Sequence, residues 1–546
     1  MTRPDFLFEV CFEACNKVGG IHTVVSSKAR HMTEEFQNFF VIGPYLEGIS
    51  EKEFIEDDVP DNLEKVFNEL SEEGIYFKFG HWDIEGSPKT ILIDTRGFSH
   101  VADHLKKLYW EEFSVDSLGS GWDFDEPMLW STAAGKFIER FQEKNKGKRI
   151  VGHFHEWISG FGILLLKHSQ SPVKTVFTTH ATMLGRSISG SGEDLYGIID
   201  DINPEEEAKR HGVMNKFSTE RACAHNSDKF TTVSEITGME AEKILGRKPD
   251  PLVFNGLDLR EFPDDKELEE KRNKSREELL KIAECMTGEK LIERKDDIEI
   301  FFTSGRYEFK NKGMDVFIDS IRDMEKDMRD NQDVRKAIAF FFVPNGWKEM
   351  NEELKENIGR HDEDRESFLA EGKKNIISSH DLENENDEML KALQDSGLTR
   401  EDSMIRCLII PIYLSEGDGL FNMGYYDITS GCDLGVFASY YEPWGYTPPE
   451  SLAVGVPTVT SDLAGYGRFI KGSETENRDV FILERMQKRR EEITESLKIF
   501  LWKAFDDERT ITERIRSCRS TAEKTEWNRF LEKYLKSYER ALENKD

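Results

Sequence analysis

One stretch, residues 440–462, constrains the fold of this 546-residue chain more than any other. A short apolar run precedes it, a glycine turn lies inside it, and a second apolar run closes it. Thr447 and Glu450 have the spacing of a capping box with prolines in the first helical turn, and Gly455 with a proline soon after is typical of a helix end. We expect a helix from Pro448, and therefore the succession strand, loop, helix, strand.

The same stretch places two carboxylates around its turn, Glu442 and Glu450. In open α/β sheets ligands bind beyond the carboxyl ends of the strands, close to the positive ends of helices. Glu450 has two interpretations, a helix-capping carboxylate or a ligand contact. Glu442 lies between tyrosine and Pro-Trp, where a carboxylate is costly to desolvate, and this setting favours a functional role over an ordinary surface position.

Strand-like runs alternate with helix-like stretches along the whole chain, which predicts βαβ units and mostly parallel sheets. The first series comprises residues 6–11, 39–42, 90–94, 150–155, 175–179 and 229–233. The second series comprises residues 298–303, 338–343, 404–412, 434–437 and 458–460. Two series indicate an α/β protein with two Rossmann-like domains.

The domain limits follow from the charged stretches between these runs. We predict an N-terminal domain over 1–258 and a C-terminal domain over 259–508. The last segment, 509–546, has helical spacing of its large apolar residues and is predicted to dock back onto the first domain. Residues 347–402, rich in Glu and Lys, are too long for an ordinary crossover and are predicted to form a helical insertion that packs on another subunit or remains solvated.

Composition excludes several partners. A formal net charge of -32 argues against non-specific binding to nucleic acid or to an anionic membrane. Nowhere do eighteen apolar residues run together, so we expect no membrane span and a cytoplasmic protein. The seven cysteines are scattered without a Cys-x-x-Cys pair, which indicates reduced thiols and no zinc site.

Three further groups of residues follow predicted strands. Gly19 and Gly20 open a helical stretch, where backbone amides suit a diphosphate, although a simple turn explains them equally well. Residues 153–157 and 178–182 carry histidines at strand ends, as a ligand site or as buried support; their spacing does not favour a metal, and we predict none. Arg306 and Lys312 follow another strand as candidate diphosphate ligands or surface cations.

Five of these motifs resemble glycogen synthase of glycosyltransferase family 3, the animal and fungal type that some prokaryotes also have. They stand in family order and extend over most of the chain: Asn-Lys-Val-Gly-Gly at 16–20, His-Phe-His-Glu-Trp at 153–157, Thr-Thr-His-Ala-Thr-x-Leu-Gly-Arg at 178–186, Gly-Arg-Tyr-Glu-Phe-x-Asn-Lys-Gly at 305–313 and Glu-Pro-Trp-Gly-Tyr-Thr-Pro-x-Glu at 442–450.

The resemblance implies the GT-B fold, two Rossmann-like domains with parallel sheets facing across a deep cleft that holds the active site. It implies transfer of glucose from UDP-glucose to the non-reducing end of an α-1,4-glucan such as glycogen, with retention at the anomeric carbon. No cofactor is implied. The family also implies a homotetramer, with the 347–402 insertion at its contacts.

The resemblance also assigns roles to residues. The catalytic group would be Glu442 near the glucose, Arg306 and Lys312 at the leaving diphosphate, and His155 in the sugar pocket. In the nucleotide-sugar site, Tyr425 or its neighbour Tyr426 would stack on the base, and Glu450 would bind the ribose. The other nucleotide-sugar contacts would come from Lys17, Gly19, Gly20, His180, Asn255, Trp444, Gly445, Tyr446 and Thr447. Because no second carboxylate is evident beside Glu442, we expect a same-face internal return rather than a double displacement.

Alternatives remain open at this point. Relatives sense glucose 6-phosphate through a dense arginine cluster, and the nearest match here is a thinner one that predicts at most a weak anion site: Arg485, Lys488, Arg489 and Arg490. The donor could be ADP-glucose instead of UDP-glucose. Two other hypotheses are a glucan phosphorylase, which needs pyridoxal phosphate, and a non-catalytic glucan-binding subunit.

Overall fold

The computed structural model describes residues 3–472 and 478–543. The chain divides into two compact units, unit 1 (Met1–Gly256 with Glu526–Asp546) and unit 2 (Leu257–Thr525). The sequence predicted the return to the first domain at residue 509, but 509–525 belong to unit 2, because helix α20 (Ile511–Ala522) packs on the unit 2 helices α11 (Asp265–Thr287) and α17 (Thr447–Ala453).

Unit 1 is built on an eight-stranded sheet with the order β3-β4-β5-β2-β1-β6-β7-β8. All its pairings are parallel except β3–β4 and β4–β5. Its strands are β1 (Phe6–Val10), β2 (Phe39–Pro44), β3 (Phe54–Glu56), β4 (Tyr76–Trp82), β5 (Lys89–Asp94), β6 (Ile150–His155), β7 (Lys174–Thr179) and β8 (Lys229–Thr232). The six predicted strands are thus confirmed.

The two antiparallel strands at the sheet edge were not predicted. β3 has only three residues, and β4 mixes exposed, partly buried and buried positions, with charged Lys78 among the partly buried ones. Neither forms the continuous apolar run of a strand that is buried on both faces. The helices of unit 1 are α1 (Gly20–Glu35), α2 (Asp61–Ser71), α3 (Ala102–Phe113), α4 (Trp122–Lys144), α5 (Glu156–His168), α6 (Met183–Gly190), α7 (Leu195–Ile198), α8 (Pro204–Arg210), α9 (Met214–Asn226), α10 (Glu235–Leu245) and α21 (Trp527–Glu543).

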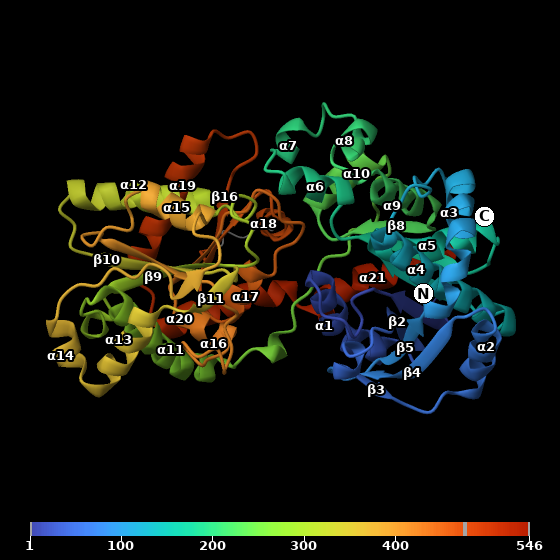
Figure 1. Ribbon diagram of the computed structural model, residues 1–546, viewed down its shortest axis with the longest axis horizontal. Coiled ribbons are helices and arrows are strands. Elements are labelled where there is room, and N and C mark those ends of the chain that lie inside the picture. The colour runs from blue at the N-terminus through green and yellow to red at the C-terminus, as the bar shows by residue number, and fades with distance from the viewer. Residues whose placement is uncertain (1–2, 473–477, 544–546) are drawn as a thin grey trace. The chain divides into compact units, whose positions relative to one another are not determined.

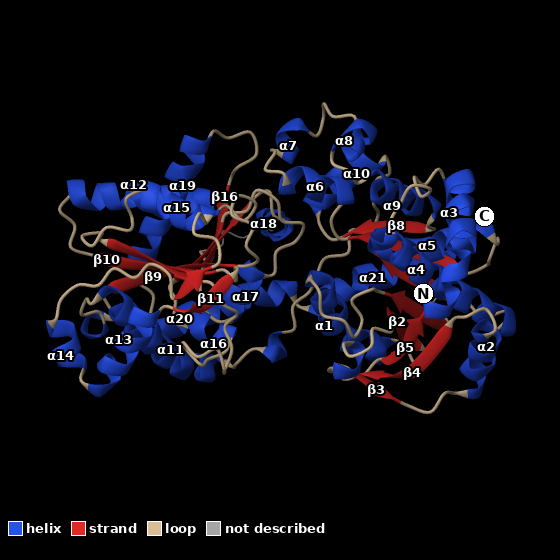
Figure 2. Cartoon of the chain, viewed as in Figure 1, coloured by secondary structure: helices blue, strands red, loops and turns tan. Residues whose placement is uncertain are grey.

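Unit 2 contains a six-stranded parallel sheet with the order β13-β10-β9-β14-β15-β16. Helices lie on both of its faces (Figure 2). The strands are β9 (Ile298–Ser304), β10 (Lys336–Phe342), β13 (Ile405–Ile410), β14 (Leu434–Phe437), β15 (Thr458–Ser461) and the unpredicted β16 (Val480–Leu483). Besides α11, α17 and α20, the helices are α12 (Met314–Asp330), α13 (Glu352–Glu363), α14 (Arg365–Ala370), α15 (Glu388–Asp395), α16 (Tyr425–Ser430), α18 (Gly465–Lys471) and α19 (Arg490–Phe505).

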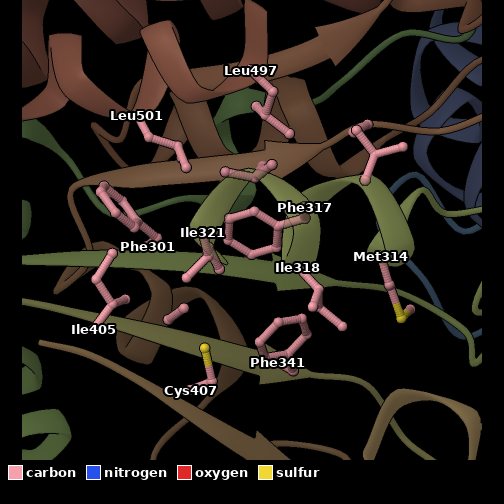
Figure 3. Packing of buried hydrophobic residues seen from close by; sticks show 14 of the residues in the cluster. Phe301, Met314, Phe317, Ile318, Ile321, Phe341, Ile405, Cys407, Leu497 and Leu501 are labelled. Atoms are coloured by element: carbon pink, nitrogen blue, oxygen red, sulfur yellow. The ribbon is translucent and has the colours of Figure 1, made fainter. Parts of the chain in front are cut away.

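The core of unit 2 shows why the parallel strands are so apolar. Phe317 and Ile321 of α12 and Leu497 of α19 pack over the sheet against Phe301 and Phe341, all nearly inaccessible to water (Figure 3). Covering helices on both faces require apolar side chains on both sides of each strand. This packing fixes the carboxyl ends of β9 and β14, and the candidate site residues of unit 2 follow those ends.

Two local predictions in unit 2 were wrong. Helix α17 begins at Thr447 rather than Pro448, its N-cap is Tyr446, and no side chain caps it. The capping box of Thr447 and Glu450 therefore does not form. The 347–402 insertion is not purely helical, because β11 (Trp347–Met350) and β12 (His380–Leu382) form an antiparallel pair within it.

Helix α21 carries the end of the chain to the sheet of unit 1, and its red ribbon lies among the blue and teal elements in Figure 1. It contacts β6, β7, β8 and α1. Trp527, Phe530, Tyr534 and Tyr538 recur at helical spacing and are buried in this contact. Among the described helices, none is both long and apolar enough to cross a membrane.

Candidate active site

The loop between β9 and α12 carries the two predicted diphosphate ligands. Arg306 is exposed, and its guanidinium lies 3.0 Å from the Glu308 carboxylate. Lys312 is largely buried. The loop ends at Gly313, which has a φ of 71° and lies so close to the Ala438 carbonyl that a Cβ atom would collide with it. This close approach joins the Lys312 loop to the segment that follows β14.

The segment after β14 carries Glu442, and the two loops meet there. The Lys312 ammonium lies 2.5 Å from Oε2 of Glu442, with 17% and 21% of the two side chains exposed. Gly445 has a φ of 92°, and a Cβ atom there would lie 2.9 Å from Cγ of Glu442. The turn therefore requires glycine for its backbone conformation and for the room it leaves to the carboxylate.

This arrangement pairs a cation with a carboxylate at the carboxyl end of a parallel sheet. Both groups retain some exposure, so a ligand has access to them. The ammonium can neutralise an anionic leaving group, and the carboxylate can stabilise positive charge on a neighbouring carbon. The structure thus brings Glu442 and Lys312 together, as predicted, and leaves Arg306 on the surface.

Glu450 faces a tyrosine rather than its own helix terminus. Its carboxylate accepts a hydrogen bond from the Tyr426 hydroxyl at 3.1 Å. Burial raises the pKa of Glu450 to about 7, although this hydrogen bond acts in the opposite direction. The hydroxyl of Tyr425, the other predicted base-stacking residue, forms a hydrogen bond of 2.6 Å with the hydroxyl of Ser304. The capping interpretation of Glu450 is therefore wrong, and a carboxyl with an unusual pKa remains at the predicted ribose position.

The other residues of this segment differ in accessibility. Trp444 is only 3% exposed and packs against Tyr466 and Phe469, with ring centroids 6.1 and 5.9 Å apart. Tyr446 is partly buried, and its carbonyl accepts a hydrogen bond from the Glu450 amide at 3.0 Å. Trp444 thus acts as an apolar support of the turn, a role that the sequence prediction of a ligand contact did not include.

In unit 1, the glycine loop before α1 already holds an anion from its own chain. The carboxylate Oε2 of Glu13 accepts hydrogen bonds from the amides of Gly19 and His22, both at 2.8 Å. The glycine motif predicts a diphosphate at these amides. The structure places the Glu13 carboxylate there instead, while Lys17 is exposed beside it.

A buried polar network lies behind the predicted sugar-pocket histidines. Oε1 of Glu9 on β1 lies 2.5 Å from the Lys28 ammonium and 2.8 Å from Nε2 of His155. Nδ1 of His155 lies 2.9 Å from Nε2 of His180. Burial by itself raises the pKa of the Glu9 carboxyl. The Lys28 charge and the hydrogen bond from His155 outweigh this effect and lower the pKa to about 2. Burial also lowers the pKa values of both histidines.

His153 is the buried support that strand alternation indicated. Its Nδ1 lies 3.0 Å from the Tyr538 hydroxyl on α21, and its Nε2 lies 2.7 Å from the Thr178 hydroxyl. Glu9, His153 and His155 have potential metal-ligand atoms within 4.8 Å of one another. Protein groups already contact both ring nitrogens of each histidine and Oε1 of Glu9, whereas Oε2 of Glu9 is buried without a hydrogen-bond partner among the described residues. The Lys28 ammonium on Glu9 supplies the positive charge. The donor set therefore does not fit a metal.

Sequence reasoning missed a carboxylate next to this network. Glu156 opens α5 with a φ of 65°, an uncommon conformation for a residue other than glycine. Its carboxylate accepts hydrogen bonds from the amides of His180 and Ala181, at 2.9 and 3.2 Å. Burial raises its pKa to about 7. Glu9 was also missed, and the available signal was a lone acidic residue inside an apolar strand.

The remaining predicted site residues are Asn255 and the four cations of the predicted anion site. Asn255 is buried, and its Oδ1 has no hydrogen-bond partner among the described residues. Arg485 is buried over the Tyr440 ring, 3.4 Å from its centroid. The other three cations are paired with carboxylates: Lys488 and Arg489 with Glu492, and Arg490 with Asp315 and Asp319. Arg485 and Arg490 thus both contact Tyr440, whereas Lys488 and Arg489 pair with Glu492.

Two solved structures share the fold of this protein. Over 99% of both chains, the protein matches the catalytic domain of starch synthase IV from Arabidopsis thaliana, bound to ADP and acarbose, with a TM-score of 0.57 and 14% identity. It also matches sucrose-phosphate synthase from Thermosynechococcus elongatus over 98% of both chains, with a TM-score of 0.51 and 11% identity. At this identity the likeness establishes the fold, which is GT-B.

Sequence comparison identifies the family within that class. The family model described as glycogen synthase matches residues 9–361 and 367–545. The liver glycogen [starch] synthase of Mus musculus is 31% identical over 85% of this chain and 72% of its own length. The glycogen [starch] synthase of Dictyostelium discoideum is 31% identical over 92% of this chain and 62% of its own length. The chain is a glycosyltransferase, and it belongs to the glycogen synthase family.

Proposed function

We propose that the protein transfers glucose from UDP-glucose to the non-reducing end of an α-1,4-glucan, with retention at the anomeric carbon. The observation that carries this proposal is the contact of 2.5 Å between Lys312 and Glu442. Cleavage of a sugar–phosphate bond leaves negative charge on the diphosphate and positive charge on the sugar. Lys312 neutralises the former, and Glu442 stabilises the latter.

The surroundings of Glu442 support an internal return on one face of the sugar. A double displacement by two carboxylates needs a pair about 5 Å apart. The group in contact with Glu442 is a cation, Lys312. In the proposed step the diphosphate oxygen leaves, and the acceptor hydroxyl attacks from the same side and passes its proton to the leaving phosphate. A covalent glucosyl adduct on Glu442, trapped with a slow donor analogue, would contradict this mechanism.

The remaining contacts follow from the site. Glu450 binds the ribose, with Tyr425 or Tyr426 near the base, and Arg306 turns from Glu308 to the diphosphate. His180 and Asn255 serve the donor sugar, and His155, whose ring nitrogens contact Glu9 and His180, supports His180 from behind. No cofactor enters this chemistry. We further propose a cytoplasmic homotetramer with contacts through the 347–402 insertion, which light scattering after size-exclusion chromatography would test.

The direct test offers the protein glycogen with either UDP-glucose or ADP-glucose and measures polymer growth. We expect growth with UDP-glucose. Growth with ADP-glucose alone would replace the donor and retain the reaction. No growth with either donor would overturn the proposal in favour of a non-catalytic glucan-binding subunit. An absorption band at wavelengths well above those of the protein itself would instead indicate the pyridoxal phosphate of a phosphorylase.

A further inference from the structure

In the buried network of unit 1, the ionised carboxylate of Glu9 determines which histidine nitrogens donate hydrogen bonds and which accept them. An ionised carboxylate only accepts hydrogen bonds, so His155 must donate to Glu9 through Nε2. A neutral imidazole carries one proton, and Nδ1 of His155 is therefore an acceptor. The contact of 2.9 Å between Nδ1 of His155 and Nε2 of His180 then requires the proton to be on His180.

We infer that the Glu9 carboxylate, acting through His155, fixes the tautomer of His180, so that Nδ1 of His180 presents a lone pair to a ligand hydroxyl. Glu9 is thus a positioning residue separated from the ligand by two side chains, His155 and His180, and Lys28 lies one side chain further away. His180 is only 6% exposed, and its Nε2 contacts His155. No described residue forms a hydrogen bond with its Nδ1, so this nitrogen is available to a ligand. The matching group on the ligand is a hydroxyl that donates a hydrogen bond.

Charged groups around the network keep Glu9 ionised and both histidines neutral. Lys28 is fully buried against Glu9 and holds the carboxylate ionised, while its ammonium also opposes protonation of His155 and His180. Arg186 on α6 acts on His180 in the same sense. We call the succession Glu9, His155, His180 the relay. A second proton on His155 would place an N–H against Nε2 of His180, and the proton of His180 would then have to move to Nδ1. Burial from β1, α1, β6 and α21 disfavours that charged form.

The relay predicts which sugars the site accepts. A lone pair attracts a hydroxyl hydrogen and repels a carboxylate or phosphate oxygen. A donor sugar with an anionic group at the position facing His180 is therefore excluded without any steric clash. This consequence for the donor rests on the proposed function, whereas the tautomer itself does not.

The test is nitrogen NMR of the full chain with ¹⁵N-labelled histidine rings. The chain has 13 histidines, and the variants His155→Asn and His180→Asn assign the two signals. In the wild type we expect both rings to carry the proton on Nε2. In Glu9→Gln/Lys28→Met, the amide at position 9 can also donate and no buried charge is left alone, so a population of His180 with the proton on Nδ1 should appear.

Tyr538→Phe is the matched control. It removes a buried hydrogen bond to His153 and leaves the His155–His180 step intact, so the His180 signals should not change. A wild-type His180 with the proton on Nδ1 would overturn the inference. Unchanged His180 signals in folded Glu9→Gln/Lys28→Met would overturn it equally.

Kinetics separate this inference from the proposed function. With a transferring enzyme, Glu9→Gln/Lys28→Met should raise KM for the nucleotide sugar about 10-fold, as expected for one lost hydrogen bond, with kcat much less affected. A protein that transfers no glucose but shows the predicted tautomers would refute the function and leave the relay intact. Transfer with the opposite tautomer would refute the relay alone.

Discussion

The two units hold their candidate site residues in opposite ways. In unit 1, Glu9, Lys28 and His155 are all at most 1% exposed, and each is bonded within the protein. In unit 2, Glu442 and Lys312 contact each other and are about one-fifth exposed. A buried network preserves one geometry and one protonation pattern, whereas an accessible ion pair can exchange its partner for a ligand. Unit 1 thus supplies fixed positions, and unit 2 supplies charge.

The largest expected effect is on the charge of unit 2. Glu442→Gln keeps the shape and removes the charge that stabilises the sugar, so kcat should fall about 1000-fold, the upper range for one electrostatic group. Glu484→Gln is the control, because Glu484 forms a comparable contact with Lys471 at 2.7 Å but is exposed. Transfer rates measured with labelled donor should be unchanged by the control. A loss of less than tenfold in Glu442→Gln would refute its assigned role.

The second effect concerns the stability of unit 1. Glu9→Gln leaves the buried Lys28 charge without its partner, and the free energy of unfolding should fall by about 3–5 kcal/mol. Adding Lys28→Met should recover part of the loss, because no buried charge then remains. Urea denaturation of the three proteins measures both changes. A single variant as stable as the wild type would show that the ion pair is not as buried as the structure has it.

The same ion pair predicts an acid limit. The pKa of Glu9 is lowered in the folded state to about 2 from an ordinary value of 4.5. A lowered carboxyl pKa contributes stability above the ordinary value, and this contribution is lost as the pH falls from about 4.5 towards 2. Unfolding free energies of the wild type and of Glu9→Gln/Lys28→Met should therefore converge in this range. Parallel curves would contradict the lowered pKa.

Glu450 in unit 2 should show the opposite dependence. Burial raises its pKa to about 7, so the folded state binds a proton that the unfolded chain releases near its ordinary value of 4.5. Stability should fall as the pH rises from about 4.5 to 7, by about 3 kcal/mol, and then level off. Glu450→Gln should remove this slope. An unchanged slope in the variant would assign the titration to other groups, of which Glu220 with a pKa near 8 is one.

The smallest effect is expected at the end of the chain. Tyr538→Phe removes one buried hydroxyl contact with His153 and should cost about 1 kcal/mol of stability with no change in transfer. Thermal unfolding and an activity assay measure the two. A loss of activity in this variant would mean that α21 takes part in the site rather than supporting the sheet.

The sequence predicted the parallel strands well, because strands buried on both faces read as continuous apolar runs. It failed for β3 and β4, which are short or half exposed at an edge, and for the parallel strand β16, a four-residue edge strand with two partly buried residues. Strand ends located Glu442, Lys312, His155 and His180, since parallel strands bring their carboxyl ends to one edge. The roles of Glu9 and Glu156 could not be predicted, because their partners His155 and His180 are distant in the sequence. Glu13 was missed although its partners lie only six and nine residues further along the chain.

Capping shows a different limit. The spacing of Thr447 and Glu450 matched a capping box, yet the nearby hydroxyl of Tyr426 binds the carboxylate in the folded unit. A local pattern competes with tertiary partners that the sequence does not reveal. The predicted anion site at Arg490 illustrates the same point, since Asp315 and Asp319 on α12 already pair with that guanidinium.

The most direct test of this division of labour is one set of steady-state measurements of glucose transfer from UDP-glucose to glycogen. The wild type, Glu442→Gln and Glu9→Gln/Lys28→Met are compared for kcat and KM. We predict a fall in kcat for Glu442→Gln and a rise in KM for the double variant. The reverse pattern, a KM effect at Glu442 and a kcat effect at Glu9, would contradict the account.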